Sequence, residues 1–277
     1  MPDEAINSTI QTLTIAGTDS GGGAGVMADI KTMQERHVFA AAVVVAVTAQ
    51  NTIGVQDFMA MPKKMIDEQF ASVASDLKIR ACKTGMLADV ATVEAVVENL
   101  KKYDLGTLTV DPVMIAKGGA RLLSEDAIST VRDKLLPLAD ILTPNLPEAE
   151  ELTGIKIEDR DQMVVAAKKL QAMGVKNVLI KGGHQTESDR SADFTLLENG
   201  QSFWISAPRI DTVRTHGTGD TLSSCITAEI AKGADVQTAI RTGKKYVQAT
   251  IADGIQVGHG HGPLNHWAKI TDEEGVK

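Results

Sequence analysis

Short apolar runs alternate with longer amphipathic stretches along most of this chain. The apolar runs are rich in Val, Ile and other residues that favour strands, and turn-forming residues bound them. Two of these runs flank Asn199-Gly200, which indicates a hairpin. The predicted strands are residues 12–16, 40–48, 79–84, 107–110, 141–142, 177–181, 192–197 and 202–205.

The amphipathic stretches place apolar residues three and four positions apart, which is the spacing of one helix face. The predicted helices are residues 24–36, 62–75, 90–103, 125–135, 160–173, 219–231 and 236–252. Regular alternation of strand and helix predicts an α/β fold, in which helices cover both faces of a central, mostly parallel sheet. The stretch 52–61 interrupts the alternation, and we interpret it as a small flap or an edge strand.

The sequence contains no linker rich in Pro, Gly or Ser, no internal repeat and no low-complexity segment. We therefore expect residues 1–277 to form a single domain, with residues 1–11 as a disordered N-terminal tail. That tail is polar and acidic and lacks the basic and apolar regions of a signal peptide. The longest apolar run, residues 38–47, is shorter than the roughly 20 residues that a membrane-spanning helix needs, so no membrane partner is expected.

Charge and cysteine content narrow the classes of partner. The formal net charge of −8 disfavours binding to nucleic acid or to an anionic membrane. An anionic ligand must then be held by local dipoles and a few lysines. The two cysteines, Cys82 and Cys225, lie far apart and form no disulfide framework, which indicates a cytoplasmic protein.

Polar residues and glycines follow the ends of the predicted strands. They are Gly17-Thr18-Asp19, Gln50-Asn51, Lys83-Thr84-Gly85-Met86, Asp111-Pro112, Asn145 to Glu148 and Lys181-Gly182-Gly183-His184. In parallel sheets covered by helices, ligands bind outside the carboxyl ends of the strands, where these segments meet. Stability alone does not explain this concentration, so we expect a ligand site at that edge of the sheet.

The hexapeptide HGTGDT at positions 216–221 carries the most specific signal. Gly217 and Gly219 flank Thr218 at the start of a predicted helix, where backbone N–H groups and the helix dipole can hold an anion. A carboxylate at Asp220 would repel that anion unless it accepts a proton from a hydroxyl group that attacks a phosphate. The alternative is an aspartate that caps the helix after a glycine turn.

Four further positions allow both a chemical and a structural interpretation. Asn145 and Glu148 follow a strand end, and they either hold hydrated magnesium and phosphates or begin a helix. Lys181 ends a buried strand before two glycines, and it either neutralises a phosphate or extends to solvent. Asp29 lies within a predicted helix and is either a substrate contact or a solvated helix residue.

Other motifs are weaker. Residues 23–28 match a dinucleotide-binding fingerprint, but the acidic residue expected about 20 positions later is absent, so a glycine loop facing a small substrate is favoured. No P-loop motif occurs. His259 and His261 lack cysteine or carboxylate partners, which favours a glycine-rich loop packed near the sheet edge over a metal site. Lys117, before two further glycines, is similar to Lys181 and lies on a predicted loop.

Taken together, the ordered motifs resemble those of the ribokinase-like superfamily. Within it they are most similar to the hydroxymethylpyrimidine/phosphomethylpyrimidine kinases of thiamine biosynthesis. The resemblance implies a ribokinase-like three-layer α/β/α sandwich, and it covers essentially the whole chain. The matching runs are residues 13–19, 23–25, 28–32, 49–52, 83–87, 111–114, 143–149, 181–184, 216–219 and 257–260.

The resemblance also implies a reaction. Magnesium-ATP would donate its γ-phosphoryl group to the hydroxymethyl group of 4-amino-5-hydroxymethyl-2-methylpyrimidine, and then to the monophosphate to give the diphosphate. Gln50 would read the aminopyrimidine edge, because a carboxamide offers a donor beside an acceptor. The implied lining of the same pocket is Gly17, Asp29, Met86 and Val113.

The implied phosphate chemistry uses the other strand ends. Asn145 and Glu148 would organise ATP and Mg²⁺ with Asp111 nearby, and the two carboxylates would act on the metal through water. Lys181 would contact the transferred phosphate. The implied anion hole is Gly217, Thr218 and Gly219. We also expect a homodimer.

One position departs from the family pattern, because Asp220 stands where the family usually has cysteine. Aspartate is the usual base elsewhere in the superfamily, and phosphoryl transfer depends mostly on positioning and charge stabilisation. A fixed negative charge would nevertheless oppose a substrate that already carries a phosphate. The alternative reading is a pyridoxal or pyridoxine kinase of the same branch, or dual activity, although related pyridoxal kinases tend to lack the glutamine found here as Gln50.

Overall fold

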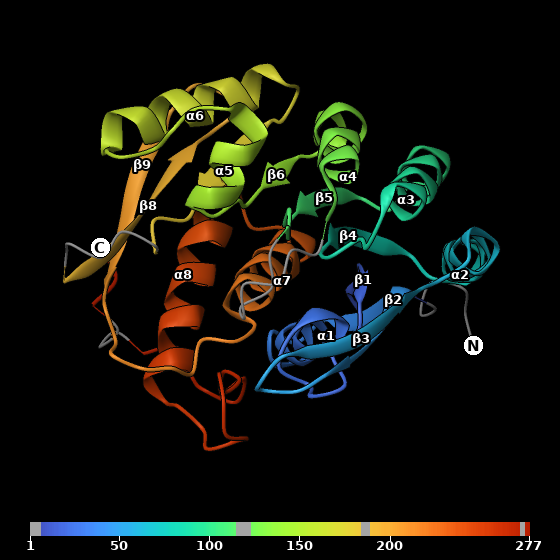
Figure 1. Cartoon of the computed structure of the whole chain (residues 1–277), viewed down its shortest axis with the longest axis horizontal. Coiled ribbons are helices and arrows are strands. Elements are labelled where there is room, and N and C mark those ends of the chain that lie inside the picture. Colours follow the sequence, from blue (N-terminus) through green and yellow to red (C-terminus); the bar gives the residue numbers. More distant parts are fainter. Residues whose placement is uncertain (1–6, 115–122, 184–188, 272–274) are drawn as a thin grey trace.

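In the part of the chain that the structure describes, nine strands form one sheet at the centre of the molecule (Figure 1). The computed structural model describes residues 7–114, 123–183, 189–271 and 275–277. Within these ranges the strand order is β3-β2-β1-β4-β5-β6-β7-β8-β9. The strands are β1 (Gln11–Gly17), β2 (Phe39–Gln50), β3 (Val55–Ala60), β4 (Ile79–Thr84), β5 (Thr107–Val110), β6 (Ile141–Leu142), β7 (Asn177–Ile180), β8 (Arg190–Leu196) and β9 (Ser202–Pro208).

The inner strands of the sheet are parallel and the outer ones are antiparallel. β2, β1, β4, β5, β6 and β7 all run in the same direction. β3 pairs antiparallel with β2 at one edge, and the β8–β9 hairpin continues antiparallel from β7 at the other. The predicted mostly parallel sheet is confirmed, and the interruption at residues 52–61 contains an edge strand.

Helices cover both faces of the sheet, which gives the predicted three-layer sandwich (Figure 1). The first helical layer is α1 (Gly25–Glu35), α7 (Thr218–Ala231) and α8 (Val236–Ala252). α1 and α7 pack against β1, β2, β4 and β5, and α8 packs against α7 and β9. The second layer is α2 (Lys63–Asp76), α3 (Val90–Lys102), α4 (Glu125–Thr130), α5 (Leu146–Thr153) and α6 (Arg160–Ala172). None of the described helices is long and apolar enough to cross a membrane.

Apolar side chains explain why the layers hold together. Val43 and Val45 of β2 are fully buried in the same cluster as Phe70 of α2. In a separate cluster, Leu222 of α7 packs with Leu179 of β7. Each fully buried side chain of this size contributes about 1.5–3 kcal/mol relative to an exposed one. The sheet therefore has a hydrophobic core on each of its two faces.

The structure departs from the predicted elements in three places. α5 begins directly after Asn145, where the sequence indicates a helix start only as one of two interpretations. The predicted helix 125–135 is α4 followed by a π-helical turn over Val131–Leu135. Gln11 is buried and belongs to β1, so the predicted tail extends too far, and residues 1–6 lie outside the described ranges.

The carboxyl ends of β1 and β4 lie side by side at one edge of the sheet. From β1 the chain continues into α1 in one helical layer, and from β4 it continues into α3 in the other. Neighbouring strands whose connections diverge in this way leave a crevice between them, where ligands bind in open α/β sheets. The fold therefore favours a site at this edge.

Candidate active site

A cavity of about 880 Å³ lies along the carboxyl edge of the sheet. Its volume falls in the range of small-ligand sites, roughly 300–1,000 Å³. The predicted site residues that line it are Gly17, Gln50, Met86, Asp111, Val113, Asn145, Glu148, Lys181, Gly217, Thr218, Gly219 and Asp220. The structure therefore brings together every predicted site residue except Asp29.

The amino terminus of α7 forms one wall of the cavity from its backbone. Gly217 has a φ of +81°, and a Cβ there would lie 2.0 Å from the carbonyl oxygen of Gly23, so a side chain does not fit. α7 begins at Thr218, and the N–H groups of a first helical turn lack partners within the helix. These groups and the helix dipole suit a phosphate, as the sequence predicts.

Asp220 lies in the same first turn, and its side chain is 15% exposed. One of its carboxylate oxygens, Oδ1, is 3.7 Å from the Nζ atom of Lys83. Lys83 extends from β4 and is fully buried. Burial would lower the pKa of Lys83, but the charges of Asp29, Asp220 and Asp111 outweigh it and raise the pKa. A buried ammonium group therefore lies behind the carboxylate at the mouth of the anion site.

Asp29 does not lie in the wall of the cavity, where the resemblance implies it. Its side chain is fully buried in α1 and is not among the residues that line the cavity. It accepts hydrogen bonds from Thr14 at 2.5 Å, from Lys83 at 2.7 Å and from Ser224 at 2.6 Å. Burial raises the pKa of Asp29 to about 6, although the charge of Lys83 opposes this. This corrects the expected substrate contact: Asp29 holds Lys83, and Lys83 faces Asp220.

The ends of β5, β6 and β7 carry a group of polar residues that we call the phosphate half: Asp111, Asn145, Glu148 and Lys181. The Nζ atom of Lys181 donates to Oδ1 of Asp111 at 2.9 Å. Burial would lower the pKa of Lys181, but the charges of Asp111 and Glu148 outweigh it and raise the pKa. Lys181 is therefore a cation held at the cavity wall.

Asn145 and Glu148 form a capping box at the start of α5. Oδ1 of Asn145 accepts from the backbone N–H of Glu148 at 2.9 Å, and Oε2 of Glu148 accepts from the backbone N–H of Asn145 at 2.8 Å. Both residues also line the cavity, so the two interpretations of this motif are compatible. Burial raises the pKa of Glu148 to about 7, with the charge of Lys181 acting against the shift.

Asp111 shows where a cation fits. Its Oδ2 atom is buried and has no hydrogen-bond partner among the described atoms. A buried carboxylate oxygen without a donor is unfavourable unless a positive group binds it. Within the described residues, no three His, Cys, Asp or Glu side chains gather as a metal cluster. Magnesium suits this arrangement, because it keeps several water ligands and needs only one or two carboxylates.

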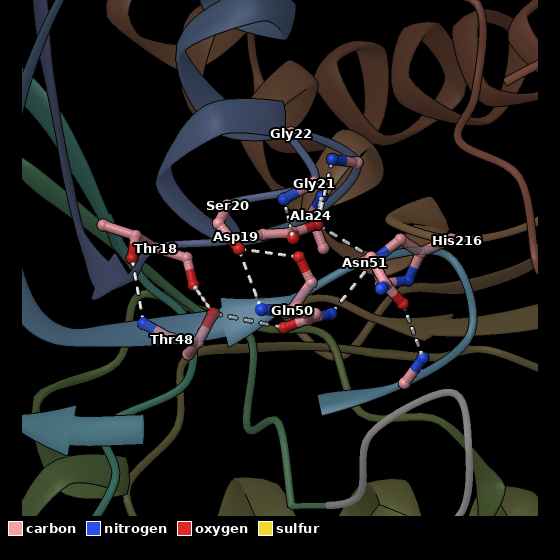
Figure 2. A network of polar contacts seen from close by, with 12 residues as sticks. Thr18, Asp19, Ser20, Gly21, Gly22, Ala24, Thr48, Gln50, Asn51 and His216 are labelled. Atoms are coloured by element: carbon pink, nitrogen blue, oxygen red, sulfur yellow. Dashed lines mark hydrogen bonds and ion pairs between the residues drawn. The ribbon is translucent and has the colours of Figure 1, made fainter. Parts of the chain in front are cut away.

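The loop after β1, the end of β2 and the segment before α7 carry a second polar group, which we call the substrate half (Figure 2). It comprises Thr18, Asp19, Ser20, Thr48, Gln50 and His216. Asp19 is buried; its Oδ1 accepts from the backbone N–H of Gly21, and its Oδ2 accepts from those of Gly23 and Ala24. Nε2 of His216 lies 3.0 Å from the same Oδ2. Burial would raise the pKa of Asp19, but these hydrogen bonds outweigh it and lower the pKa.

Gln50 is held through both its backbone and its side chain (Figure 2). Oγ of Ser20 accepts from the backbone N–H of Gln50 at 2.8 Å and donates to its carbonyl oxygen at 2.6 Å. The side-chain amide nitrogen of Gln50 lies 3.2 Å from Nε2 of His216, and its side-chain amide oxygen lies 3.4 Å from Oγ1 of Thr48. Gln50 therefore reaches the cavity from a fixed position on β2.

Several residues of the site carry little or no signal in the sequence. His216 lies within the HGTGDT motif, but nothing in the local pattern reveals its contact with Asp19. Lys83 carries a recognisable signal, because a lone lysine within a buried strand needs an anionic partner. Lys244 and Asp193 form an ion pair of 2.6 Å that no motif indicates, and Lys244 lines the cavity from α8.

The glycine-rich segment at residues 258–262 packs at the sheet edge, as predicted. The backbone N–H of His261 donates to the carbonyl oxygen of Thr52 at 2.8 Å. The carbonyl oxygen of Gly262 accepts from the backbone N–H of His216 at 3.2 Å. The segment therefore connects the β2–β3 turn to the loop before α7. Lys117 and His184, two further candidates of the sequence analysis, lie outside the described residues.

Comparisons with known proteins agree with this geometry. The family model described as phosphomethylpyrimidine kinase matches residues 19–265. A hydroxymethylpyrimidine/phosphomethylpyrimidine kinase of Haemophilus influenzae is 52% identical over 260 residues, which cover 93% of this chain and 97% of that protein. The thiamine biosynthesis bifunctional protein ThiED of Geobacter sulfurreducens is 44% identical, over 94% of this chain and 53% of that protein. A solved ADP complex of Bacillus subtilis pyridoxal kinase has a TM-score of 0.87 and 35% identity, over 94% of this chain and 98% of that chain.

Proposed function

The chain belongs to the phosphomethylpyrimidine kinase family, and from that premise we propose that it transfers the γ-phosphoryl group of ATP to the hydroxymethyl group of an aminopyrimidine. The monophosphate formed is then phosphorylated again to the diphosphate, for thiamine biosynthesis. The observation that carries the proposal is that Asp220 and Gln50 line one cavity. A carboxylate beside an anion site and a carboxamide for a heterocycle are the two groups that this reaction needs.

In the proposed reaction the hydroxyl oxygen of the substrate attacks the γ-phosphorus of ATP. A new oxygen–phosphorus bond forms, the bond from the γ-phosphorus to its bridging oxygen breaks, and ADP leaves. Asp220 accepts the proton of the hydroxyl group. Lys181 and the backbone N–H groups at the start of α7 stabilise the charge on the transferred group.

The residues of the phosphate half would hold the magnesium ion. Asp111 and Glu148 would bind it through water, and Asn145 would face the phosphates beside it. When bound, the ion neutralises charge on the phosphate oxygens. The unpartnered Oδ2 atom of Asp111 supports this assignment.

The decisive experiment compares two substrates. The purified protein is mixed with magnesium-ATP and either the aminopyrimidine or pyridoxal, and ADP release is measured together with ³¹P spectra of the products. We expect the aminopyrimidine monophosphate first and the diphosphate after it. ADP release with pyridoxal but not with the aminopyrimidine would contradict the proposed substrate.

Pyridoxal is a second candidate substrate, because the pyridoxal kinase of Bacillus subtilis shares the fold at 35% identity. Gln50 favours the aminopyrimidine over it. A carboxamide pairs well with an amino group next to a ring nitrogen, and pyridoxal has no such pair. Activity on both substrates, with a preference for the aminopyrimidine, is also compatible with the proposal.

We also propose that the enzyme acts as a homodimer in the cytoplasm. Val47 and Met59 pair directly across β2 and β3, and they are 45% and 63% exposed. An exposed apolar pair at the edge of the sheet suits contact with a second copy. Cys82 and Cys225 are both free, which suits a reducing compartment. Light scattering at assay concentration tests the dimer.

A further inference from the structure

The ring of His216 lies between two polar groups of the substrate half (Figure 2). Its Nε2 atom is 3.0 Å from Oδ2 of Asp19 and 3.2 Å from the carboxamide of Gln50. An ionised carboxylate only accepts hydrogen bonds, so the ring nitrogen that faces Asp19 must carry a hydrogen. That hydrogen lies near both neighbours. Figure 2 shows the amide nitrogen of Gln50 at this position, which sets one N–H group against another. Exchanging the oxygen and nitrogen of the carboxamide puts the carbonyl oxygen there and removes the conflict.

Thr48 leads to the same orientation independently. Its hydroxyl group donates its single hydrogen to the carbonyl oxygen of Thr18 at 2.8 Å. The atom of Gln50 that lies 3.4 Å from Oγ1 of Thr48 is placed as the amide oxygen, which leaves two oxygens facing each other with no hydrogen between them. Oγ1 of Thr48 can then only accept from the carboxamide. The end of the carboxamide that faces Thr48 must be its NH₂ group. Oxygen and nitrogen of a carboxamide are assigned from such a network, and here both neighbours agree.

We propose that His216 and Thr48 are specificity-determining residues, which hold the Gln50 carboxamide with its oxygen toward His216 and its nitrogen toward Thr48. This inference rests on the proposed function and adds the direction in which the substrate ring enters. After these two contacts, one amide hydrogen and one lone pair of the carbonyl oxygen remain for a ligand. A carboxamide free to turn would present both orders of donor and acceptor, whereas the held one presents a single order.

The held carboxamide selects one direction of an aminopyrimidine ring. Along the reactive edge of that ring, a ring nitrogen, the amino group and the hydroxymethyl group follow in this order. The ring nitrogen pairs with the amide hydrogen on the Thr48 side, and the amino group pairs with the carbonyl oxygen on the His216 side. The hydroxymethyl group then continues past His216, the residue that leads directly into Gly217 and the first turn of α7. A ring turned the other way carries its hydroxyl group away from Asp220.

Asp19 is the fixed point of this arrangement. It accepts from three backbone N–H groups of its own loop besides His216, so its carboxylate cannot turn without breaking several hydrogen bonds. A Cβ at Gly23 would lie 2.7 Å from Cδ2 of His216, so the ring also packs closely against this loop. The orientation of Gln50 is thus set on one side by the neighbouring Thr48 and on the other by Asp19 and His216, which lie far from it in sequence.

Two pairs of variants test the proposal through steady-state kinetics. His216→Leu and Thr48→Val each remove one contact to the carboxamide, and we expect KM for the aminopyrimidine to rise about 3- to 10-fold with a smaller change in kcat. His216→Gln keeps a donor for Asp19 and Gln50, and Thr48→Ser keeps the hydroxyl group. We expect these conservative variants to recover most of the loss, which a role in packing alone does not predict.

A measurement on the ligand-free protein tests the orientation without any activity. Nitrogen-15 spectra of the histidine rings should show Nε2 of His216 protonated at neutral pH. Nuclear Overhauser contacts should join the side-chain amide hydrogens of Gln50 to the methyl group of Thr48. An unprotonated Nε2, or amide contacts to the His216 ring instead, would overturn the proposal.

The two experiments separate this inference from the proposed function. If the wild-type protein does not phosphorylate the aminopyrimidine, the function fails while the spectra still report the carboxamide orientation. If it does and the spectra show the opposite orientation, the inference fails alone. Equal KM increases in Thr48→Val and Thr48→Ser would also count against it, because the hydroxyl group would then be irrelevant.

Discussion

The substrate half and the phosphate half of the cavity use polar groups in opposite ways. In the substrate half, Asp19 and Gln50 have hydrogen-bond partners at both ends of their side chains. In the phosphate half, Oδ2 of Asp111 lacks a partner among the described atoms, and Glu148 has a pKa raised to about 7. The polar groups of the substrate half therefore have their hydrogen-bond partners without a ligand. The phosphate half contains carboxylates whose charge a bound ligand would balance.

This difference indicates a division of labour. Side chains that folding has already ordered can bind a neutral ring with little further loss of conformational entropy. Charged side chains whose charge is not fully balanced by neighbouring groups interact most strongly with the charge that develops during phosphoryl transfer. Damage to the substrate half should therefore appear mainly in KM, and damage to the phosphate half mainly in kcat.

The largest expected effect comes from Asp220, which lies where the two halves meet. Asp220→Ala should lower kcat by about 10²- to 10⁴-fold, because the attacking hydroxyl group loses its proton acceptor. Binding of ATP, measured by calorimetry, should be nearly unchanged. A kcat close to the wild-type value would show that Asp220 is not the proton acceptor. It would also contradict the placement of the reaction between the two halves.

The next effect concerns the phosphate half alone. Lys181→Met removes the cation beside the transferred group and should lower kcat by about 10²- to 10³-fold, the cost of losing one stabilising group of this kind. Steady-state kinetics should show little change in KM for the aminopyrimidine. Lys176→Met is the control, because Lys176 lies near the opposite end of β7 with a side chain 53% exposed. A KM that rises as much as kcat falls would contradict the division between the halves.

A third test examines the buried support beneath Asp220. Lys83→Met leaves the carboxylates of Asp29 and Asp220 without their shared cation, and the free energy of unfolding should fall by about 3–5 kcal/mol. Urea denaturation measures the loss. Lys64→Met is the matched control, since the Lys64 side chain is 86% exposed and its ion pair with Glu68 contributes at most about 1 kcal/mol. Equal losses in both variants would argue against a structural ion pair at Lys83.

The smallest expected effect is a pH dependence of stability in the phosphate half. The pKa of Glu148 is about 7 in the folded protein and 4.5 in its ordinary state, so between these values the folded state binds more protons. The contribution of Glu148 to stability is therefore largest at low pH and falls as the pH rises through this window. The unfolding free energy of the wild type minus that of Glu148→Gln should fall by up to about 3 kcal/mol as the pH rises through this window. A difference that rises with pH would reverse the assignment.

Periodicity was sufficient to predict the layers of the fold and most of its elements. Strand runs such as residues 79–84 and helices such as residues 236–252 match the structure closely, because each buries one repeating face. α5 was harder to predict, since its eight residues are bounded by Asn145 and Gly154 and carry little periodic signal. The π-helical turn over Val131–Leu135 depends on tertiary packing and leaves no local pattern.

The site was predictable where it follows strand ends and unpredictable where it depends on pairing across layers. Gln50, Lys181 and Asp220 stand at positions that the topology itself brings to one edge of the sheet. For Asp29 both interpretations were wrong, the substrate contact and the solvated helix residue, because neither the resemblance nor the helix pattern says that Lys83 lies opposite it. The role of His216 needs the contact with Asp19, and no spacing rule joins residues from such distant segments.

The contact between Asp19 and His216 joins residues 197 positions apart. During synthesis, the segment that carries Asp19 and Gln50 leaves the ribosome early, while the ring that orients it emerges only after most of the chain. Under the proposed function, a growing chain therefore has neither the proton acceptor nor the oriented carboxamide. The short segment at the start of α7 supplies both the residue that orients Gln50 and the proposed proton acceptor. An unfinished polypeptide therefore lacks the complete site with which the finished enzyme binds its substrate.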